Sequence, residues 1–203
     1  ADPGCNVLNG GLADLFWTEP EPATYLPTAL SRFYDPNGDG DPEDGARPFF
    51  DTLNIHTYQL DAPDSAWYQA RLEAIVEIMG RFGDAEKPIW ITETGYGSVP
   101  APAPEAEPPL VDEGTQASGV LVAYQALAGF VQVERVFWWN LRDYYHNPSA
   151  TNSEMEGHYG LLRAGYEPQP AFVAYGQLTG QLGQVLTVSA VTDAEGVARL
   201  RVP

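Results

Sequence analysis

Four short apolar runs, separated by longer helical patterns, constrain most strongly how this chain can fold. The runs are NVL (6–8), FFDTLNIH (49–56), PIWIT (88–92) and ERVFWWN (134–140). They do not alternate cleanly between apolar and polar residues, which is typical of strands covered on both faces, as in a parallel sheet. Strands that alternate with helices indicate either an open, doubly wound α/β sheet or an eightfold α/β-barrel.

Apolar residues between these runs recur at three-to-four-residue spacing and predict helices. In the clearest helix, Asp64 is expected to cap the N-terminus and Gly83 to follow the last turn. A weaker pattern contains Pro27, which suits the first turn of a helix. The predicted helices cover residues 25–34, 65–83, 115–130 and 169–180.

The barrel is favoured over the open sheet because no glycine-rich phosphate loop follows any of the four runs. Barrel enzymes place their chemistry on loops after the C-terminal ends of the strands. The unusual residues of this chain stand at such ends: His56 with Tyr58, Glu93, and Trp139 with Asn140.

A complete barrel takes about 250 residues, whereas four strand–helix units and a tail already use the 203 residues of this chain. We therefore predict half of a barrel over residues 1–182. The tail changes to alternating strand character with a turn at DAEG. Residues 183–203 are accordingly predicted to form a β-hairpin that begins an all-β accessory region.

The charge and the hydropathy of the chain exclude two classes of partner. Ten basic and 28 acidic residues give a formal net charge of −18, which repels nucleic acid and anionic lipid. The longest apolar stretch, residues 119–133, is interrupted by Gln125 and Gln132 and is shorter than the roughly 20 residues that span a bilayer. The single cysteine, Cys5, excludes an internal disulfide and is expected to be buried.

Glu93 ends a run of sheet-forming residues in the stretch KPIWITETGYG (87–97). A buried strand that ends in a carboxylate presents it at the barrel mouth, where a nucleophile must be held rigidly beside an anomeric carbon. The alternative is a structural ion pair at the strand end. Thr92 and Thr94 are expected to flank Glu93 on the opposite side of the strand, and Tyr96 to lie near it in the following turn.

Several segments together resemble the C-terminal half of a clan A retaining glycoside hydrolase, and they are most similar to its xylosidase and iduronidase-like families. The resemblance covers nearly all of residues 1–180 and implies that the four runs are strands five to eight of a (β/α)8 barrel. The segments are ADPGCNVLNGGLA (1–13), FFDTLNIHTYQ (49–59), ITETGYG (91–97), VFWWNLRDYY (136–145) and GLLRAGYEPQPAFVAY (160–175).

The resemblance implies roles for residues at three strand ends. Glu93 matches the catalytic nucleophile, and Tyr58 matches the tyrosine whose hydroxyl hydrogen-bonds that nucleophile. His56 belongs to the same His-x-Tyr motif, with a histidine of the core as the alternative. Trp139 matches the tryptophan on which a sugar ring stacks, and Trp138 is expected to point away into the barrel wall. The alternative is that both tryptophans are core residues.

Further candidates for contacts with a sugar are Tyr96, Asn140, Arg142 and Asp143, although Asp143 is equally compatible with a turn cap. Retaining hydrolysis needs a second carboxylic acid about 5 to 5.5 Å from the first. In the clan this acid follows an asparagine at the end of strand four, before the segment that this chain matches. Asp143, Glu154 and Glu156 could in principle replace it, but their sequence setting does not favour them.

The segment DPNGDGDPEDG (35–45) has alternating oxygen ligands at a spacing similar to that of a calcium-binding loop. Position twelve of such a loop is Ala46 here, in place of the bidentate glutamate. A solvated acidic turn is the preferred interpretation. The candidate calcium ligands are Asp35, Asn37, Asp39 and Asp41.

The sequence therefore predicts the nucleophile half of a retaining glycoside hydrolase that acts on a glycoside, oligosaccharide or polysaccharide. No cofactor is expected, and the partner is the missing N-terminal half of the barrel, without which the chain should be inactive. A catalytically inactive, glycan-binding barrel is the alternative. An aldolase or enolase-type lyase is disfavoured, because the one lysine, Lys87, lies at the wrong end of its strand.

Overall fold

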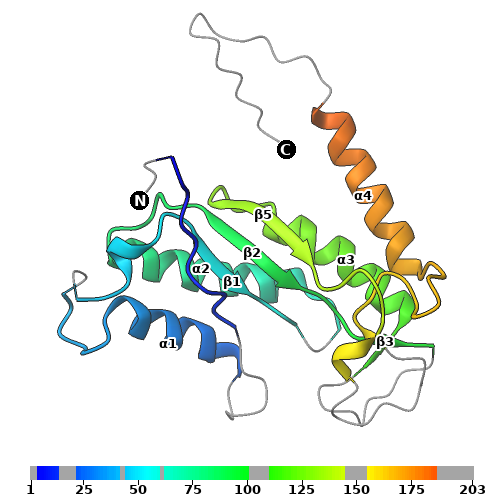
Figure 1. The fold of residues 1–203 in the computed structure, drawn as a ribbon, viewed down its shortest axis with the longest axis horizontal. Helices are drawn as coiled ribbons and strands as arrows, with labels where there is room; N and C mark the ends of the chain where they lie inside the picture. Colours follow the sequence, from blue (N-terminus) through cyan, green and yellow to red (C-terminus); the bar gives the residue numbers. More distant parts are fainter. Residues whose placement is uncertain are drawn as a thin grey trace, which may run out of the picture.

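The computed structural model describes residues 4–13, 22–41, 44–59, 62–100, 110–144 and 155–186. Figure 1 shows a central parallel sheet with helices along one face. The elements are α1 (Pro22–Tyr34), β1 (Leu53–His56), α2 (Ser65–Arg81), β2 (Ile89–Thr94), β3 (Ser98–Val99), β4 (Val111–Asp112), α3 (Glu113–Leu127), β5 (Val133–Trp138) and α4 (Pro170–Leu186), with short 3-10 helices at Arg47–Phe49 and Met155–His158.

The sheet has the order β1-β2-β5, and neighbouring strands are parallel. The N-terminal segment lies along the outer side of β1, where Leu8 and Leu12 form isolated parallel bridges. The strand predicted at residues 6–8 is thus reduced to single bridges, and Cys5 beside it is exposed instead of buried. The parallel order along the chain agrees with the alternation of strands and helices in the sequence.

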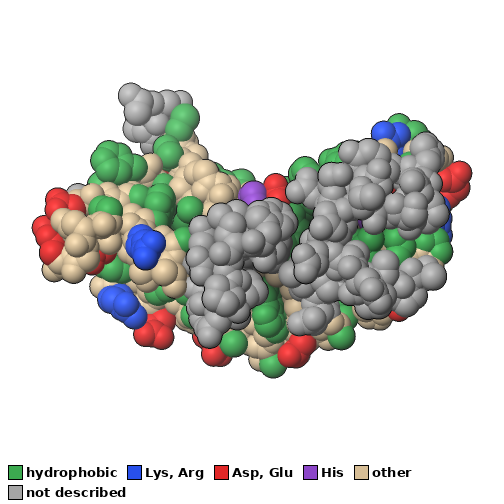
Figure 2. All heavy atoms as spheres, turned by 90° about the horizontal axis from the view of Figure 1, so that it is seen from below, with side chains coloured by type: hydrophobic (Ala, Val, Ile, Leu, Met, Phe, Trp, Pro, Cys, Tyr) green, Lys and Arg blue, Asp and Glu red, His purple; other side chains and the backbone are tan. Residues whose placement is uncertain are grey.

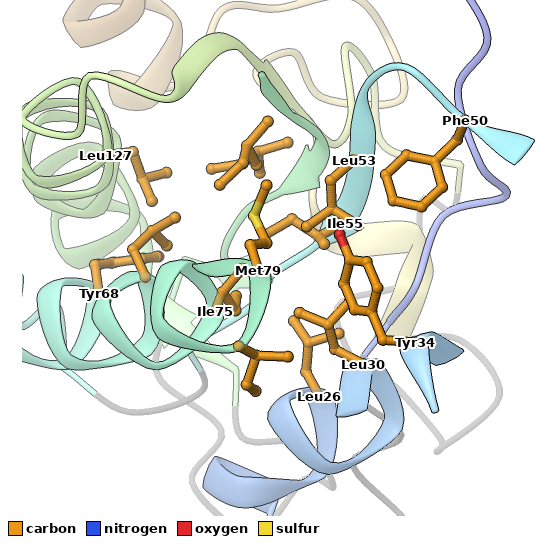
Figure 3. Close-up of a cluster of buried hydrophobic side chains, with 14 of the residues drawn as sticks. Leu26, Leu30, Tyr34, Phe50, Leu53, Ile55, Tyr68, Ile75, Met79 and Leu127 are labelled. Carbon is orange, nitrogen blue, oxygen red and sulfur yellow. The ribbon is translucent and has the colours of Figure 1, made fainter. Parts of the chain in front are cut away.

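Alternate residues of β1 and β2 face the helices and build the main hydrophobic core. Leu53, Ile55, Ile89 and Ile91 are fully buried, and Figure 3 shows Leu53 and Ile55 amid apolar side chains of α1, α2 and α3. The intervening strand residues are only partly buried. Coverage of both faces was predicted, but the described residues cover only the helix face of the sheet.

α1 buries Leu26, Leu30 and Tyr34, which lie one turn apart on one side of the helix. The helix begins at Pro22, so the prediction that Pro27 lies in the first turn is wrong. Pro22 suits the first helical position because the N–H that proline lacks would have no helical partner there. Pro27 is tolerated inside the helix.

α2 begins and ends as the sequence predicts. Asp64 Oδ1 accepts a hydrogen bond from the Ala66 amide at 2.9 Å and caps the N-terminus. Gly83 follows the helix with φ of 80°, a left-handed conformation that glycine adopts without strain. The successive helices α1, α2, α3 and α4 each pack against the next in the chain.

α3 and α4 enclose a second core cluster, which includes Val120, Leu161 and Ala174. α3 ends at Leu127, so the apolar stretch 119–133 is divided between a helix, a turn and the start of β5. None of the helices in the described segments is long and apolar enough to cross a membrane.

α4 continues to Leu186, four residues past the predicted boundary between the barrel half and the accessory region. The hairpin predicted for residues 183–203 therefore cannot begin before the helix ends. Residues 187–203 lie outside the described part of the chain, and the hairpin remains a prediction there.

β3 and β4 form a separate parallel pair, with Ser98 opposite Val111. The sequence did not predict this pair, because each strand has only two residues. The pair joins the two ends of the proline-rich connection after β2. Its middle, residues 101–109, lies outside the described residues.

Candidate active site

Glu93 lies at the C-terminal end of β2, and two side chains from the neighbouring strand end contact its carboxylate. Tyr58 Oη donates a hydrogen bond to Glu93 Oε2 at 2.9 Å. His56 Nδ1 lies 3.2 Å from the same oxygen. The Glu93 side chain is 28% exposed and that of His56 is 21% exposed. The structure thus brings these three predicted site residues together around a carboxylate that solvent can reach.

A β-bulge in β2 controls the direction of Glu93. The register against β1 shifts just before the pair His56↔Glu93, so Thr92 and Glu93 together oppose one residue. Thr92 Oγ1 donates to Asn54 Oδ1 at 2.6 Å, and Asn54 and His56 share one face of β1. Thr92 therefore lies on the same side as Glu93, and the prediction that it lies opposite is wrong. Thr94 is fully buried.

The N-terminal segment supports the site beside β1. Asn9 Oδ1 accepts a hydrogen bond from the Asn54 amide at 2.7 Å, and Asn9 Nδ2 donates to the Asn54 carbonyl at 3.0 Å. Any Cβ at Gly11 would collide with the His56 imidazole. Asn9, Asn54 and Thr92 thus form a hydrogen-bonded row that ends next to Glu93 in β2. The sequence interpretation missed Asn9 and Gly11, although the cluster NGG (9–11) after the first apolar run was an available signal.

The two tryptophans at the end of β5 have different environments. Trp138 packs against the second core cluster, and its Nε1 donates to the Tyr159 carbonyl at 3.2 Å. It therefore lies on the helix side, as alternation predicts. Trp139 is half-buried, its amide donates to the Thr94 carbonyl at 2.8 Å, and its peptide bond to Asn140 is cis.

Asn140 is 9% exposed, and its Oδ1 accepts a hydrogen bond from the Arg142 amide at 3.0 Å. Within the described structure its Nδ2 is buried without a hydrogen-bond partner. The Arg142 guanidinium stacks on the exposed ring of Tyr166 at 4.6 Å. Asn140 thus stabilises the loop after β5 through its side-chain oxygen.

Tyr96 does not face the Glu93 carboxylate. Its side chain is 2% exposed, its hydroxyl donates to Gln59 Oε1 at 2.6 Å and accepts from Tyr68 Oη at 3.3 Å. Its ring lies against α3 at Gly119, where an added Cβ would collide with it. This placement corrects the prediction that Tyr96 contacts a sugar, because the backbone after β2 turns the ring into the interior.

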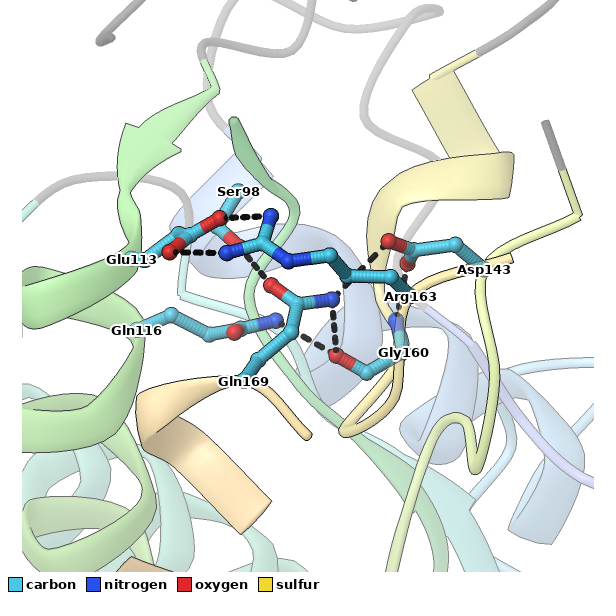
Figure 4. Close-up of polar contacts among 7 residues, drawn as sticks. All are labelled: Ser98, Glu113, Gln116, Asp143, Gly160, Arg163 and Gln169. Atoms are coloured by element: carbon cyan, nitrogen blue, oxygen red, sulfur yellow. Dashed lines mark hydrogen bonds and ion pairs between the residues drawn. The ribbon is translucent and has the colours of Figure 1, made fainter. Parts of the chain in front are cut away.

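Asp143 is also buried, at 7% exposure, and it holds two loops together (Figure 4). Its Oδ1 accepts from the Gly160 amide and its Oδ2 from Gln169 Nε2, both at 2.8 Å. Burial raises the pKa of Asp143 to about 6. The prediction that Asp143 contacts a sugar is corrected here, because both of its carboxylate oxygens accept hydrogen bonds within the protein. This role is similar to the turn cap that was the alternative.

A neighbouring ion pair fixes the same region to the start of α3. Arg163 makes a two-pronged contact with Glu113, with Nη2 2.8 Å from Oε2, and Figure 4 shows the pair beside Gln169. Hydrogen bonding to Glu113 raises the pKa of Arg163. Because the backbones of Asn140 and Leu161 are hydrogen-bonded, this ion pair also holds the loop after β5 near the start of α3.

The acidic loop after α1 bonds mainly to itself. Asp35 Oδ2 accepts from the Gly40 amide at 3.0 Å, and Asp39 Oδ1 accepts from the Asp41 amide at 2.9 Å. Asn37 Nδ2 donates to Asp39 Oδ2 at 3.2 Å. Among the residues that the structure describes, no group of three His, Cys, Asp or Glu side chains is placed to hold a metal ion. The loop is thus held together by hydrogen bonds among its own side chains and amides, and the calcium-binding alternative stays a prediction.

One edge of the molecule is concave in the view of Figure 2. In Figure 2, histidine and acidic side chains lie next to each other in the concave middle of the upper edge. A histidine and a carboxylate that share such a hollow are placed to meet a ligand from solution.

Comparison with known proteins relates the fold to one class of enzyme. No protein-family model matches the sequence, and no curated protein is significantly similar to it. A GH2 β-galacturonidase from Eisenbergiella tayi bound to glycerol has a TM-score of 0.53 and 17% identity, over 66% of this chain and 24% of that chain. A structure of GH2 β-galacturonidase from the same organism bound to galacturonate has a TM-score of 0.51, with the same identity and coverage.

The chain thus spans about a quarter of the length of the glycoside hydrolases that it matches. At 17% sequence identity, the similarity between these structures and this chain shows the fold alone. The parallel sheet with its flanking helices is shared with part of a glycoside hydrolase structure.

Proposed function

We propose that this chain is the C-terminal half of the (β/α)8 catalytic domain of a retaining glycoside hydrolase, similar to the xylosidase and iduronidase-like families of clan A. Glu93 is the nucleophile. The observation that carries this proposal is the 2.9 Å hydrogen bond from Tyr58 Oη to Glu93 Oε2, made across two adjacent parallel strand ends. A phenol that donates a hydrogen bond to a carboxylate stabilises it and leaves it ionised.

The sheet supports the assignment to half of a barrel. β1, β2 and β5 are parallel and follow one another in chain order, as consecutive barrel strands do. In the described structure the outer edge of β5 has no strand partner, and the sheet face that carries Asn54 and Glu93 has no helix layer. The N-terminal half of the barrel would pair with these edges and enclose this face.

In the proposed reaction, a Glu93 oxygen attacks the anomeric carbon of the glycoside while the bond from that carbon to the leaving oxygen breaks. A carboxylic acid from the N-terminal half gives its proton to the leaving oxygen. The same group, now a carboxylate, takes a proton from water, which attacks the anomeric carbon and releases Glu93. Tyr58 supports the departure of Glu93 by hydrogen-bonding the re-formed carboxylate. Trp139 offers a ring face for the sugar.

The test uses the protein that contains this chain together with the N-terminal half. Glu93→Gln should lower kcat by orders of magnitude and leave ligand binding largely intact, because a covalent step is lost and the side-chain volume is kept. Glu73→Gln is the matched control, since Glu73 is an exposed carboxylate of α2. A fluorinated glycoside that traps the intermediate should label Glu93, as mass spectrometry of peptides would show.

Labelling of another carboxylate would refute the role of Glu93. Sugar binding without any turnover by the wild type would instead favour a glycan-binding barrel. The 203-residue chain by itself should be inactive and should self-associate through its open strand edges. Mixing it with a separately made N-terminal half should restore hydrolysis of an aryl glycoside.

A further inference from the structure

Three consecutive residues after β1 alternate between the interior and the surface. Thr57 and Gln59 are buried, at 0% and 5% exposure, whereas Tyr58 between them is partly exposed. In an extended chain, neighbouring side chains point in opposite directions. Tyr58 thus points toward the Glu93 carboxylate, and Gln59 points into the protein behind it.

The buried Gln59 side chain makes a second connection to the segment that carries Glu93. Its Oε1 accepts hydrogen bonds from the Asp64 amide at 2.9 Å and from Tyr96 Oη at 2.6 Å. A backbone amide can only donate, so the Gln59 atom that faces it is the side-chain oxygen, and the Tyr96 hydroxyl must donate to that oxygen as well. Tyr96 follows Glu93 by three residues. The segments after β1 and β2 are therefore joined twice, once by the Tyr58 contact at the surface and once by the Gln59–Tyr96 contact in the interior.

Two helices hold this interior contact in place. Asp64 caps α2, and Tyr68 Oη on the same helix donates to Tyr96 Oη at 3.3 Å. Burial raises the pKa of Tyr68, so its hydroxyl stays protonated and able to donate. From α3, Gln116 Nε2 donates to the Tyr96 carbonyl at 2.9 Å, and Gly119 leaves space for the Tyr96 ring. Buried polar groups that are bonded in this way are costly to displace, because a displaced group would lose its partner in a place that water does not reach.

We infer that Gln59 and Tyr96 are positioning residues for the Tyr58–Glu93 pair. The inference rests on the proposed function, in which this pair takes part in the reaction. Tyr58 and Gln59 share a peptide bond, so a backbone held at Gln59 fixes where the Tyr58 hydroxyl lies. A hydrogen bond weakens steeply when its angle departs from the favoured range. Loss of the interior contact should therefore weaken the hydrogen bond from Tyr58 to Glu93, although neither of these two residues is changed.

The first test observes the Tyr58 hydroxyl directly. It uses NMR of the protein that contains both barrel halves, with its tyrosines labelled with ¹³C at Cζ. The Tyr58 signal is the one that disappears in Tyr58→Phe. Tyr96→Phe and Gln59→Leu should each shift this signal in the same direction as Glu93→Gln does, because all three substitutions weaken the same hydrogen bond. An unmoved Tyr58 signal in Tyr96→Phe and Gln59→Leu would overturn the inference.

Tyr124→Phe is the matched control for Tyr96→Phe. It also removes one buried hydroxyl, which donates to the Val136 carbonyl at 3.3 Å in the second core cluster. This variant should leave both the Tyr58 signal and the rate of hydrolysis unchanged. An equal shift of the Tyr58 signal in Tyr124→Phe would show that any buried hydroxyl has this effect, which would also overturn the inference.

Hydrolysis of an aryl glycoside tests whether the effect passes through Tyr58. Gln59→Leu should lower kcat/KM by about tenfold or more in the otherwise wild-type protein. In a Tyr58→Phe background the same substitution should change kcat/KM by less than about twofold, because the hydrogen bond that Gln59 positions is already absent. Tyr96→Phe gives the same comparison if Gln59→Leu does not fold. Equal losses in both backgrounds would show a general structural effect and would refute the positioning role.

The two tests separate this inference from the proposed function. A shift of the Tyr58 signal in a protein that hydrolyses no glycoside would support the positioning role and overturn the hydrolase. Hydrolysis that depends on Glu93, together with an unmoved Tyr58 signal, would support the hydrolase and overturn the positioning role.

Discussion

Replacing Asp143 by Asn should change how the stability of the protein depends on pH. Burial raises the pKa of Asp143 from an ordinary value of 3.8 to about 6 in the folded protein. The folded state therefore binds the proton more tightly than the unfolded state does. Below pH 3.8 both states are protonated and the group has no effect, whereas above pH 6 both are ionised and the folded state carries the full cost. The stability contribution thus falls as the pH rises from about 4 to 6.

The size of this effect follows from the same two values. The difference between about 6 and 3.8 corresponds to about 3 kcal/mol, at 1.36 kcal/mol for each pKa unit. Asp143→Asn removes this titration. The variant also loses one acceptor, which faces Gln169 Nε2, at a cost of about 1 kcal/mol that does not vary with pH. Relative to wild type, the variant should therefore gain about 3 kcal/mol of unfolding free energy between pH 4 and pH 7.

Urea unfolding followed by tryptophan fluorescence, at pH 4, 5, 6 and 7, measures this difference. Glu73→Gln controls for the loss of one negative charge, since Glu73 is exposed on α2. A wild-type-to-variant difference that stays constant over this range would show that burial does not raise the pKa of Asp143.

Three further substitutions test the surroundings of Glu93. Gly11→Ala should destabilise the protein by about 1–3 kcal/mol and displace the His56 imidazole, whereas Gly10→Ala should do neither, because a Cβ at Gly10 meets no atom within 4 Å. Thermal unfolding measures the loss of stability, and the NMR signals of His56 report the displacement. Equal behaviour of the two variants would contradict the predicted collision. Thr92→Val should lower the unfolding free energy by about 1 kcal/mol, because the hydrogen bond to Asn54 on β1 is lost, whereas Thr92→Ser should keep this hydrogen bond. Chemical denaturation compares the two variants. Equal losses of stability would argue against the hydrogen bond. Trp139→Ala should weaken binding of a monosaccharide by about 1–3 kcal/mol in calorimetry, and unchanged affinity would place Trp139 in the core.

The periodic features of the sequence were sufficient to predict most of the fold. Apolar spacing located the helices, and the cap at Asp64 and the glycine at 83 marked the ends of one of them correctly. The grouping of His56, Tyr58 and Glu93 was also predictable, because C-terminal ends of adjacent parallel strands meet at one edge of a sheet.

Features that depend on exceptions to periodicity were not predictable. The bulge at Thr92 breaks strict alternation, and its hydrogen bond to Asn54 joins residues that are distant in the sequence. The inward turn of Tyr96 depends on space left by Gly119 on another element. The burial of Asp143 depends on Gln169, 26 residues later. Each of these follows from tertiary contacts that a local pattern does not contain.

The bulge in β2 also affects how this chain should be compared with its evolutionary relatives. Thr92 is one residue more than a regular ladder between Ile91 and Glu93 would need. Removing it would leave Ile91 toward the helices, Glu93 toward the open face and Thr94 toward the helices, so the alternation of the strand would survive a loss of one codon. β-Bulges are usually conserved within families. A relative that lacked Thr92 would therefore need a one-residue gap inside this strand before its carboxylate aligned with Glu93.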